Sequence, residues 1–205
     1  MMSNEKEWFK TINEIQAIAQ NGLAYCKNEF DQERYLRLRE LAAQLAAPTS
    51  EKAPDIAHLF SFETGYATPK LDVRAFIVKN HKILLAQEKS DGLWSLPGGW
   101  VDVNESPSES VIRETREETG FHVKVIRLMA LWDKLKHDHP PQWPHAYKCF
   151  FHCDIESGEV RPDKEIAQVD FFAIETLPPL SIHRVTEKQL QRLYETIGKR
   201  EALFD

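Results

Sequence analysis

Three glutamates in one short segment have the spacing of a cation site. Glu114, Glu117 and Glu118 lie at positions i, i+3 and i+4, so on a helix their carboxylates share one face. Each like-charge pair costs about 0.2–0.5 kcal/mol on an exposed helix, so the cluster needs a reason. A hard divalent cation supplies one, because it prefers carboxylate oxygens and can also bind substrate phosphates. The alternative interpretation is a solvated acidic helix face.

The residues around these glutamates mark both ends of a helix. Ser106 and Glu109 form a capping-box pattern, and Pro107 suits a first helical turn. Gly120 is a typical C-terminal stop. We therefore predict a helix from about Pro107 to Thr119.

Further residues flank the helix at fixed spacings. Gly98-Gly99 lets backbone approach a ligand closely, and Arg113 can hold Glu105 through paired hydrogen bonds. With the three glutamates and Gly120, this segment resembles the Nudix box, G-x5-E-x7-R-E-U-x-E-E-x-G-U with U apolar. Thr115 departs from the pattern, because it is a polar residue at the first U. We expect this departure to affect helix packing more than chemistry.

The resemblance implies a fold, a cofactor and a reaction. The fold would be α/β, a Nudix α/β/α sandwich with a mixed sheet. The cofactor would be Mg²⁺ or Mn²⁺, and the reaction would be attack of water on one phosphorus of a diphosphate. By resemblance, the metal ligands would be the Gly99 carbonyl and the carboxylates of Glu114, Glu117 and Glu118, with Glu105 and Arg113 bracing the site.

The general base has two candidates. We favour Glu165, in the loop before a strand-like run that begins at Val169, because many family members place a late carboxylate there. Asp163 is the rival. An ordinary surface-loop acid is the alternative interpretation of either residue.

The elements that must position these residues fall into two parts. Apolar residues at helical spacing predict a helical hairpin in residues 1–46, with Asp31 as an N-cap of its second helix. Prolines and scattered polar residues indicate a linker at 47–69. Residues 70–205 would be the catalytic domain. Its expected strands cover 72–78, 82–87, 123–132, 146–155 and 169–174, and a closing helix begins at about Thr186.

The hairpin also resembles the helical domain of a bacterial Nudix subgroup that hydrolyses X-linked nucleoside diphosphates. Members include ADP-ribose and CDP-choline hydrolases, so the resemblance implies a small-molecule nucleoside diphosphate derivative as substrate. Two apolar stripes on so short a hairpin need an external surface, which a partner subunit or the catalytic domain could provide. We expect a homodimer.

Three aromatic residues after the box are candidate substrate-binding residues. Trp132, Trp143 and Tyr147 lie in a segment rich in aromatics and histidines. They could stack a base or enclose a quaternary ammonium such as choline. Filling a core beneath a long loop is the alternative for each. The first proline after the box, Pro140, comes later than is typical of ADP-ribose hydrolases, which weighs against that substrate.

Composition weighs against several other classes of protein. A net charge of −6 disfavours a nucleic-acid binder. No apolar stretch approaches the roughly 18 residues that suggest a membrane span, and the polar start lacks a secretory signal, so we expect a cytoplasmic protein. The three cysteines are too few for a disulfide framework. A Nudix-fold binding module without catalysis is the rival function, but the intact glutamates and Arg113 weigh against it.

Overall fold

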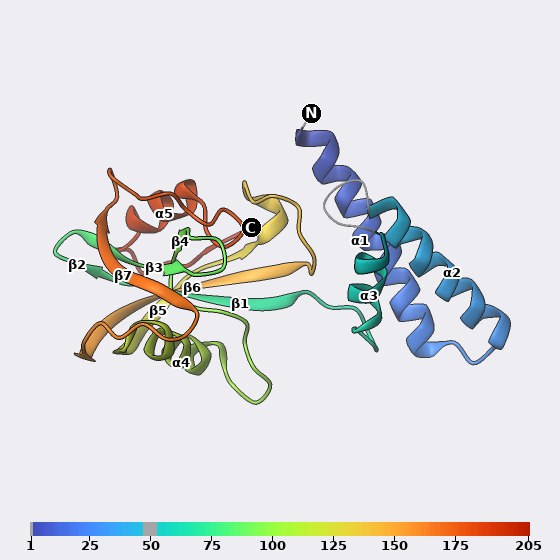
Figure 1. The fold of residues 1–205 in the computed structure, drawn as a ribbon, viewed down its shortest axis with the longest axis horizontal. Coiled ribbons are helices and arrows are strands. Elements are labelled where there is room, and N and C mark those ends of the chain that lie inside the picture. The colour runs from blue at the N-terminus through green and yellow to red at the C-terminus, as the bar shows by residue number, and fades with distance from the viewer. Residues whose placement is uncertain (1, 47–52) are drawn as a thin grey trace. The chain divides into compact units, whose positions relative to one another are not determined.

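Three helices form the first of two units. The computed structural model describes residues 2–46 and 53–205, and the helical unit combines the chain up to Pro69 with Pro141–His145 (Figure 1). Its helices are α1 (Met2–Tyr25), α2 (Glu29–Ala46) and α3 (Ala53–Ser61). Their buried core contains Ile12, Ala42, Ala43, Ala46, Ile56 and Phe60.

Two details of this unit differ from the sequence-based expectations. Helix α2 begins before Asp31, because the Asn28 side chain accepts the backbone N–H of Phe30 at 2.8 Å and acts as the cap. Helix α3 lies within the segment that we interpreted as a linker. Ile56 and Phe60, one helical turn apart, are both buried in the helical core. The apolar residues of this nine-residue helix span too few turns to establish a helical period from the sequence.

Eight strands, two α-helices and the short 3-10 helix Lys134–Lys136 form the second unit, Lys70–Pro140 with Ala146–Asp205. One sheet has the order β1-β6-β5-β8, with β5 and β6 antiparallel and the other pairs parallel. In the other sheet, β3 pairs with β2, β4 and β7, all antiparallel. The strands are β1 (Lys70–Phe76), β2 (Val78–Lys79), β3 (Lys82–Glu88), β4 (Trp94–Ser95), β5 (Phe121–Asp133), β6 (Ala146–Gly158), β7 (Ile166–Ala173) and β8 (Leu203–Phe204).

Helices cover both faces of these strands, with α4 (Pro107–Thr119) below and α5 (Glu187–Tyr194) above in Figure 1. Side chains of β3 alternate between the two layers. Leu84 packs in the cluster that contains Val111 of α4, whereas Leu85 packs in the cluster that contains Leu190 of α5. The expected α/β/α arrangement with a mixed sheet is confirmed.

The ends of α4 agree with the prediction from its capping residues. Ser106 is the N-cap with both hydrogen bonds of the capping box, and Gly120 ends the helix in the left-handed region at φ 82°. Thr115 is fully buried, and its hydroxyl donates to the Val111 carbonyl at 2.7 Å. The helix therefore satisfies the polar atom at the departing position of the box with its own backbone.

The three cysteines form no disulfide bonds. Cys26, Cys149 and Cys153 are free thiols. Cys149 and Cys153 are buried in the apolar cluster that also contains Val111 of α4. This burial fits apolar filling and not a zinc site. Over the described ranges, no helix is both long and apolar enough to cross a membrane.

Candidate active site

Two carboxylates of α4 reach the loop that precedes the helix. The backbone N–H of Gly98 donates to Glu118 Oε2 at 2.8 Å. A Cβ atom placed on Gly99 would lie 3.1 Å from Glu114 Oε2. Gly98 has φ +136°, and a side chain there would collide with the Val73 carbonyl oxygen. Glycine is therefore required at position 98, beside strand β1, whereas a side chain at position 99 would crowd the Glu114 carboxylate.

Arg113 joins the remaining acidic residues of the box. Its Nε and Nη2 atoms donate to the carboxylate of Glu105 at 2.8 and 3.0 Å. Its Nη1 atom donates to Glu114 at 2.8 Å and to Glu117 at 3.0 Å. One guanidinium thus holds three carboxylates in a fixed arrangement, as its planar set of donors allows.

Burial makes ionisation of Glu114 and Glu118 unfavourable. It raises the pKa of Glu118 to about 8 against the opposing effect of Arg74, with Glu114 adding to the increase. The pKa of Glu114 is also raised, mainly by burial. A bound cation would lower the cost of ionising both groups.

The donor atoms fit a hard divalent cation, since all of them are oxygens. Glu114 and Glu118 approach the same glycine pair. The Gly99 carbonyl accepts the N–H of Val73 at 2.8 Å and retains a second lone pair. Among the described residues, no three acidic, histidine or cysteine side chains are grouped closely enough to hold a metal, and Glu117 is bound to Arg113. Ligation by all three glutamates therefore requires Glu117 to leave Arg113.

A buried ion cluster behind the glutamates was missed from the sequence. Arg74 donates to both carboxylate oxygens of Asp72, at 3.0 and 2.8 Å, and to the Leu96 carbonyl at 3.0 Å. Lys148 donates to Asp72 at 2.7 Å. The available signal was the alternation of Asp72 and Arg74 with buried Val73 in β1, which points both charged residues to the same face of the sheet.

The two candidate bases lie in the loop before β7. Asp163 accepts the backbone N–H groups of Glu165 and Ile166, at 2.7 and 3.0 Å, so its carboxylate organises the loop. The Glu165 side chain is exposed, with Lys164 at 3.9 Å. Of the two, Glu165 has the carboxylate that is more accessible to solvent.

The three candidate aromatic residues lie in different surroundings. Trp132 is 1% exposed, with its ring 5.2 Å from that of Phe150 in the core of the second unit. Trp143 packs in the helical unit, 4.0 Å between ring centroids from Phe9. Tyr147 is 40% exposed on β6. The first two rings serve as packing in this structure, so we retain only Tyr147 as a proposed contact to substrate.

Comparisons with known proteins agree with this geometry. Residues 68–193 match the NUDIX domain family, and residues 6–60 match a family described as a UDP-X-like, N-terminal oligomerisation domain. YjhB of Bacillus subtilis strain 168, provisionally named an ADP-ribose pyrophosphatase, is 41% identical, with both chains covered over their full length.

Two solved structures are also similar. A UDP-X diphosphatase is 36% identical with a TM-score of 0.63, covering 97% of this chain and 98% of its own. An ADP-ribose pyrophosphatase from Streptococcus suis 89-1591 is 42% identical with a TM-score of 0.62, covering 67% of this chain and 100% of its own. The chain therefore belongs to the Nudix hydrolase family and carries that family's UDP-X-like N-terminal domain.

Proposed function

We propose that this chain hydrolyses the diphosphate of a nucleoside diphosphate linked to a group X, releasing a nucleoside monophosphate and phospho-X. The observation that carries the proposal is the meeting of Glu114 and Glu118 with the Gly98-Gly99 loop, braced by Arg113. The similar proteins named as ADP-ribose pyrophosphatases and as a UDP-X diphosphatase support this substrate class. ADP-ribose and CDP-choline are candidate substrates.

Nudix hydrolases generally use divalent metal ions, and we propose Mg²⁺ or Mn²⁺ here. The ligands would be the carboxylates of Glu114, Glu117 and Glu118 with the Gly99 carbonyl. When bound, such an ion neutralises charge on the phosphates and makes a water molecule more acidic. Arg113 would keep Glu114 oriented and would remain anchored by Glu105 while Glu117 turns to the metal.

We propose Glu165 as the general base that takes the proton from the attacking water. Its exposed carboxylate lies in a loop whose geometry Asp163 maintains through two backbone bonds. Glu165→Gln should lower kcat about 10²- to 10⁴-fold with KM nearly unchanged. A similar loss of kcat in Asp163→Asn but none in Glu165→Gln would transfer the role to Asp163.

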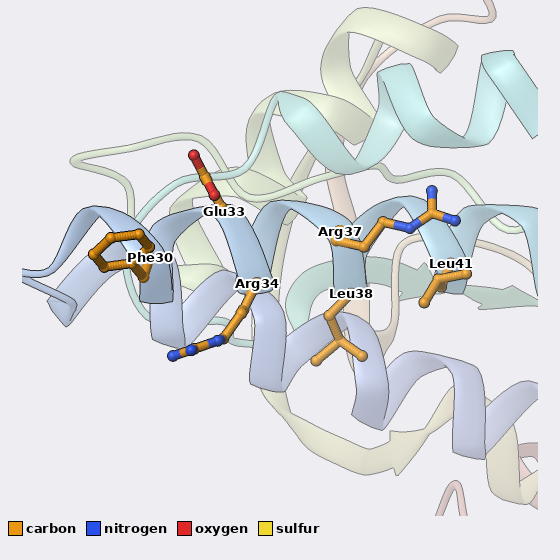
Figure 2. A pocket seen from close by; sticks show the side chains of 6 residues that line it. All are labelled: Phe30, Glu33, Arg34, Arg37, Leu38 and Leu41. Atoms are coloured by element: carbon orange, nitrogen blue, oxygen red, sulfur yellow. The ribbon is translucent and has the colours of Figure 1, made fainter.

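We further propose a homodimer that forms through the outer face of α2. Figure 2 shows a groove on this helix, lined by Phe30, Glu33, Arg34, Arg37, Leu38 and Leu41. Phe30 is 69% and Leu41 is 38% exposed, which is unusual for a row of large apolar side chains on one helix. The match of residues 6–60 to an oligomerisation domain supports a second copy of this chain as the partner.

The experiment that tests the proposed function is turnover against a panel of nucleoside diphosphate derivatives with Mg²⁺ or Mn²⁺. Hydrolysis in ¹⁸O water, followed by mass spectrometry, identifies the phosphorus that is attacked. We expect a nucleoside monophosphate and phospho-X from at least one substrate, and no turnover in chelator. Full activity in chelator, or no activity on any diphosphate, would overturn the proposal.

A further inference from the structure

One tryptophan of the second unit lies at the surface beside the acidic site. Trp94 and Trp132 are 8% and 1% exposed, and each packs against a phenylalanine ring. Trp100 is 47% exposed, and within the described ranges no aromatic ring packs against it. A single exposed apolar side chain is common and needs no explanation by itself. The case for a role of Trp100 therefore rests on where its backbone lies.

Trp100 lies two residues beyond the point where Glu118 meets the loop. The Pro97 carbonyl accepts the Ala75 N–H of β1 at 2.9 Å. In a trans peptide the C=O group and the following N–H point in opposite directions, so the Gly98 N–H points away from β1. Glu118 accepts this N–H at 2.8 Å and therefore lies at the outer edge of the loop. Phosphates bound to a metal at this edge would place the groups attached to them beside Trp100.

Backbone hydrogen bonds on both sides of Trp100 hold it in place. The Val73 N–H donates to the Gly99 carbonyl at 2.8 Å, and the Val101 N–H donates to the Leu71 carbonyl at 3.0 Å. The main chain at Trp100 is therefore fixed against β1, and only the two torsions of its side chain remain free. An aromatic ring on such a backbone loses little conformational entropy when it contacts a ligand.

The residue directly opposite Trp100 is Asp72, through an antiparallel bridge. The two bonds that flank this bridge make it a non-hydrogen-bonded pair, in which the side chains lie close together on one face. The Asp72 carboxylate is nearly buried and accepts from Arg74 and Lys148 at 2.7–3.0 Å. Because these charges satisfy one another, the half-exposed indole ring is the surface that this pair offers to a ligand.

We propose that the Trp100 ring is the platform on which the nucleobase of the substrate stacks. This inference rests on the proposed function. Only the ribose separates the base from the diphosphate, so the base can reach a ring that lies one residue beyond the Gly99 carbonyl. Stacking on an aromatic side chain tightens binding about 5- to 150-fold per base, and it tolerates every base because each has a π-face. The chain should therefore accept more than one nucleoside.

The test compares ligands that differ only in the base. AMP, CMP, UMP and ribose 5-phosphate are titrated calorimetrically into the full chain with Mg²⁺. We expect the tightest nucleotide to bind at least about fivefold better than ribose 5-phosphate. Trp100→Leu should weaken nucleotide binding about 5- to 150-fold without affecting ribose 5-phosphate, and Trp100→Phe should keep most of the preference. In turnover, Trp100→Leu should raise KM with kcat nearly unchanged.

Two variants control for the loss of an exposed side chain. Val103→Ala changes a residue of the same loop that is 88% exposed, and Trp8→Leu removes a tryptophan that is 44% exposed on α1. Both should bind the nucleotides as the wild type does.

A second readout observes the ring itself. In protein labelled with 5-fluorotryptophan, the ¹⁹F signal that Trp100→Phe removes from the five should shift with the nucleotides and not with ribose 5-phosphate. A signal that stays in place when a nucleotide binds, or a Trp100→Leu variant that weakens neither ligand or both equally, would overturn the stacking role. The absence of hydrolysis of any nucleoside diphosphate would overturn the proposed function instead, and nucleotide binding would still decide the role of Trp100.

Discussion

Replacement of Asp72 by asparagine should strongly destabilise the second unit. The Asp72 carboxylate is almost completely buried and accepts from Arg74 and Lys148 at 2.7–3.0 Å. Burial alone would raise the pKa of Asp72, but the two cations hold it well below its usual range. Removing one partner of a buried ion pair costs about 3–5 kcal/mol. That loss corresponds to a decrease in Tm of roughly 6–20 °C for a protein of this size.

Thermal and urea unfolding of Asp72→Asn would measure this loss. Asp138→Asn is the matched control, because Asp138 also binds a lysine, Lys188 at 2.6 Å, but both side chains are exposed. An exposed pair contributes about 0–1 kcal/mol, so the control should barely change Tm. Adding Lys148→Met to Asp72→Asn should recover part of the stability, because it removes an uncompensated charge. A loss below about 1 kcal/mol for Asp72→Asn would refute the reasoning.

Three further changes test other parts of the structure. Burial lowers the pKa of His139 to about 3, so between pH 7 and pH 5 only the unfolded chain takes up this proton, which costs about 2 kcal/mol of stability. The change in stability from pH 7 to pH 5, measured by urea unfolding, should therefore be about 2 kcal/mol less favourable in the wild type than in His139→Phe, and equal changes in the two proteins would refute the assignment. Arg113→Lys cannot make the paired bonds to Glu105, and kcat/KM should fall about 10- to 100-fold; unchanged kinetics would exclude the bracing role. Leu41→Glu should give a monomer by light scattering, whereas Ile18→Glu on α1 should not, and a dimer in both would place the contact elsewhere.

The parts of the site that could be predicted from sequence are those encoded locally. Helix α4 carries its own capping residues, so both of its ends follow from adjacent positions. The spacing of Glu114 and Glu118 on that helix places both carboxylates on one face. The Gly98-Gly99 loop that these carboxylates contact comes shortly before the helix in the sequence, because Gly98 and Glu118 are only 20 positions apart.

The parts that could not be predicted depend on distant pairings. The bond between Asp72 and Lys148 joins residues 76 positions apart, and it forms because β1 lies parallel to β6 with these two residues in register. The placement of Trp143 depends on a loop of the second half of the chain that packs with the N-terminal helices. Periodicity within one segment contains no information about either pairing.

The most direct test of the central claim is to measure turnover and stability together in Glu118→Gln. The substitution keeps nearly the same volume and removes a carboxylate that accepts from Gly98. Turnover of the best nucleoside diphosphate substrate at saturating Mg²⁺ should fall by several orders of magnitude. The metal-free variant should be at least as stable as the wild type, because its neutral amide carries no charge that burial would destabilise, as burial destabilises the Glu118 carboxylate. Near-normal turnover, or a loss of activity that merely follows unfolding, would contradict a metal-binding role for Glu118.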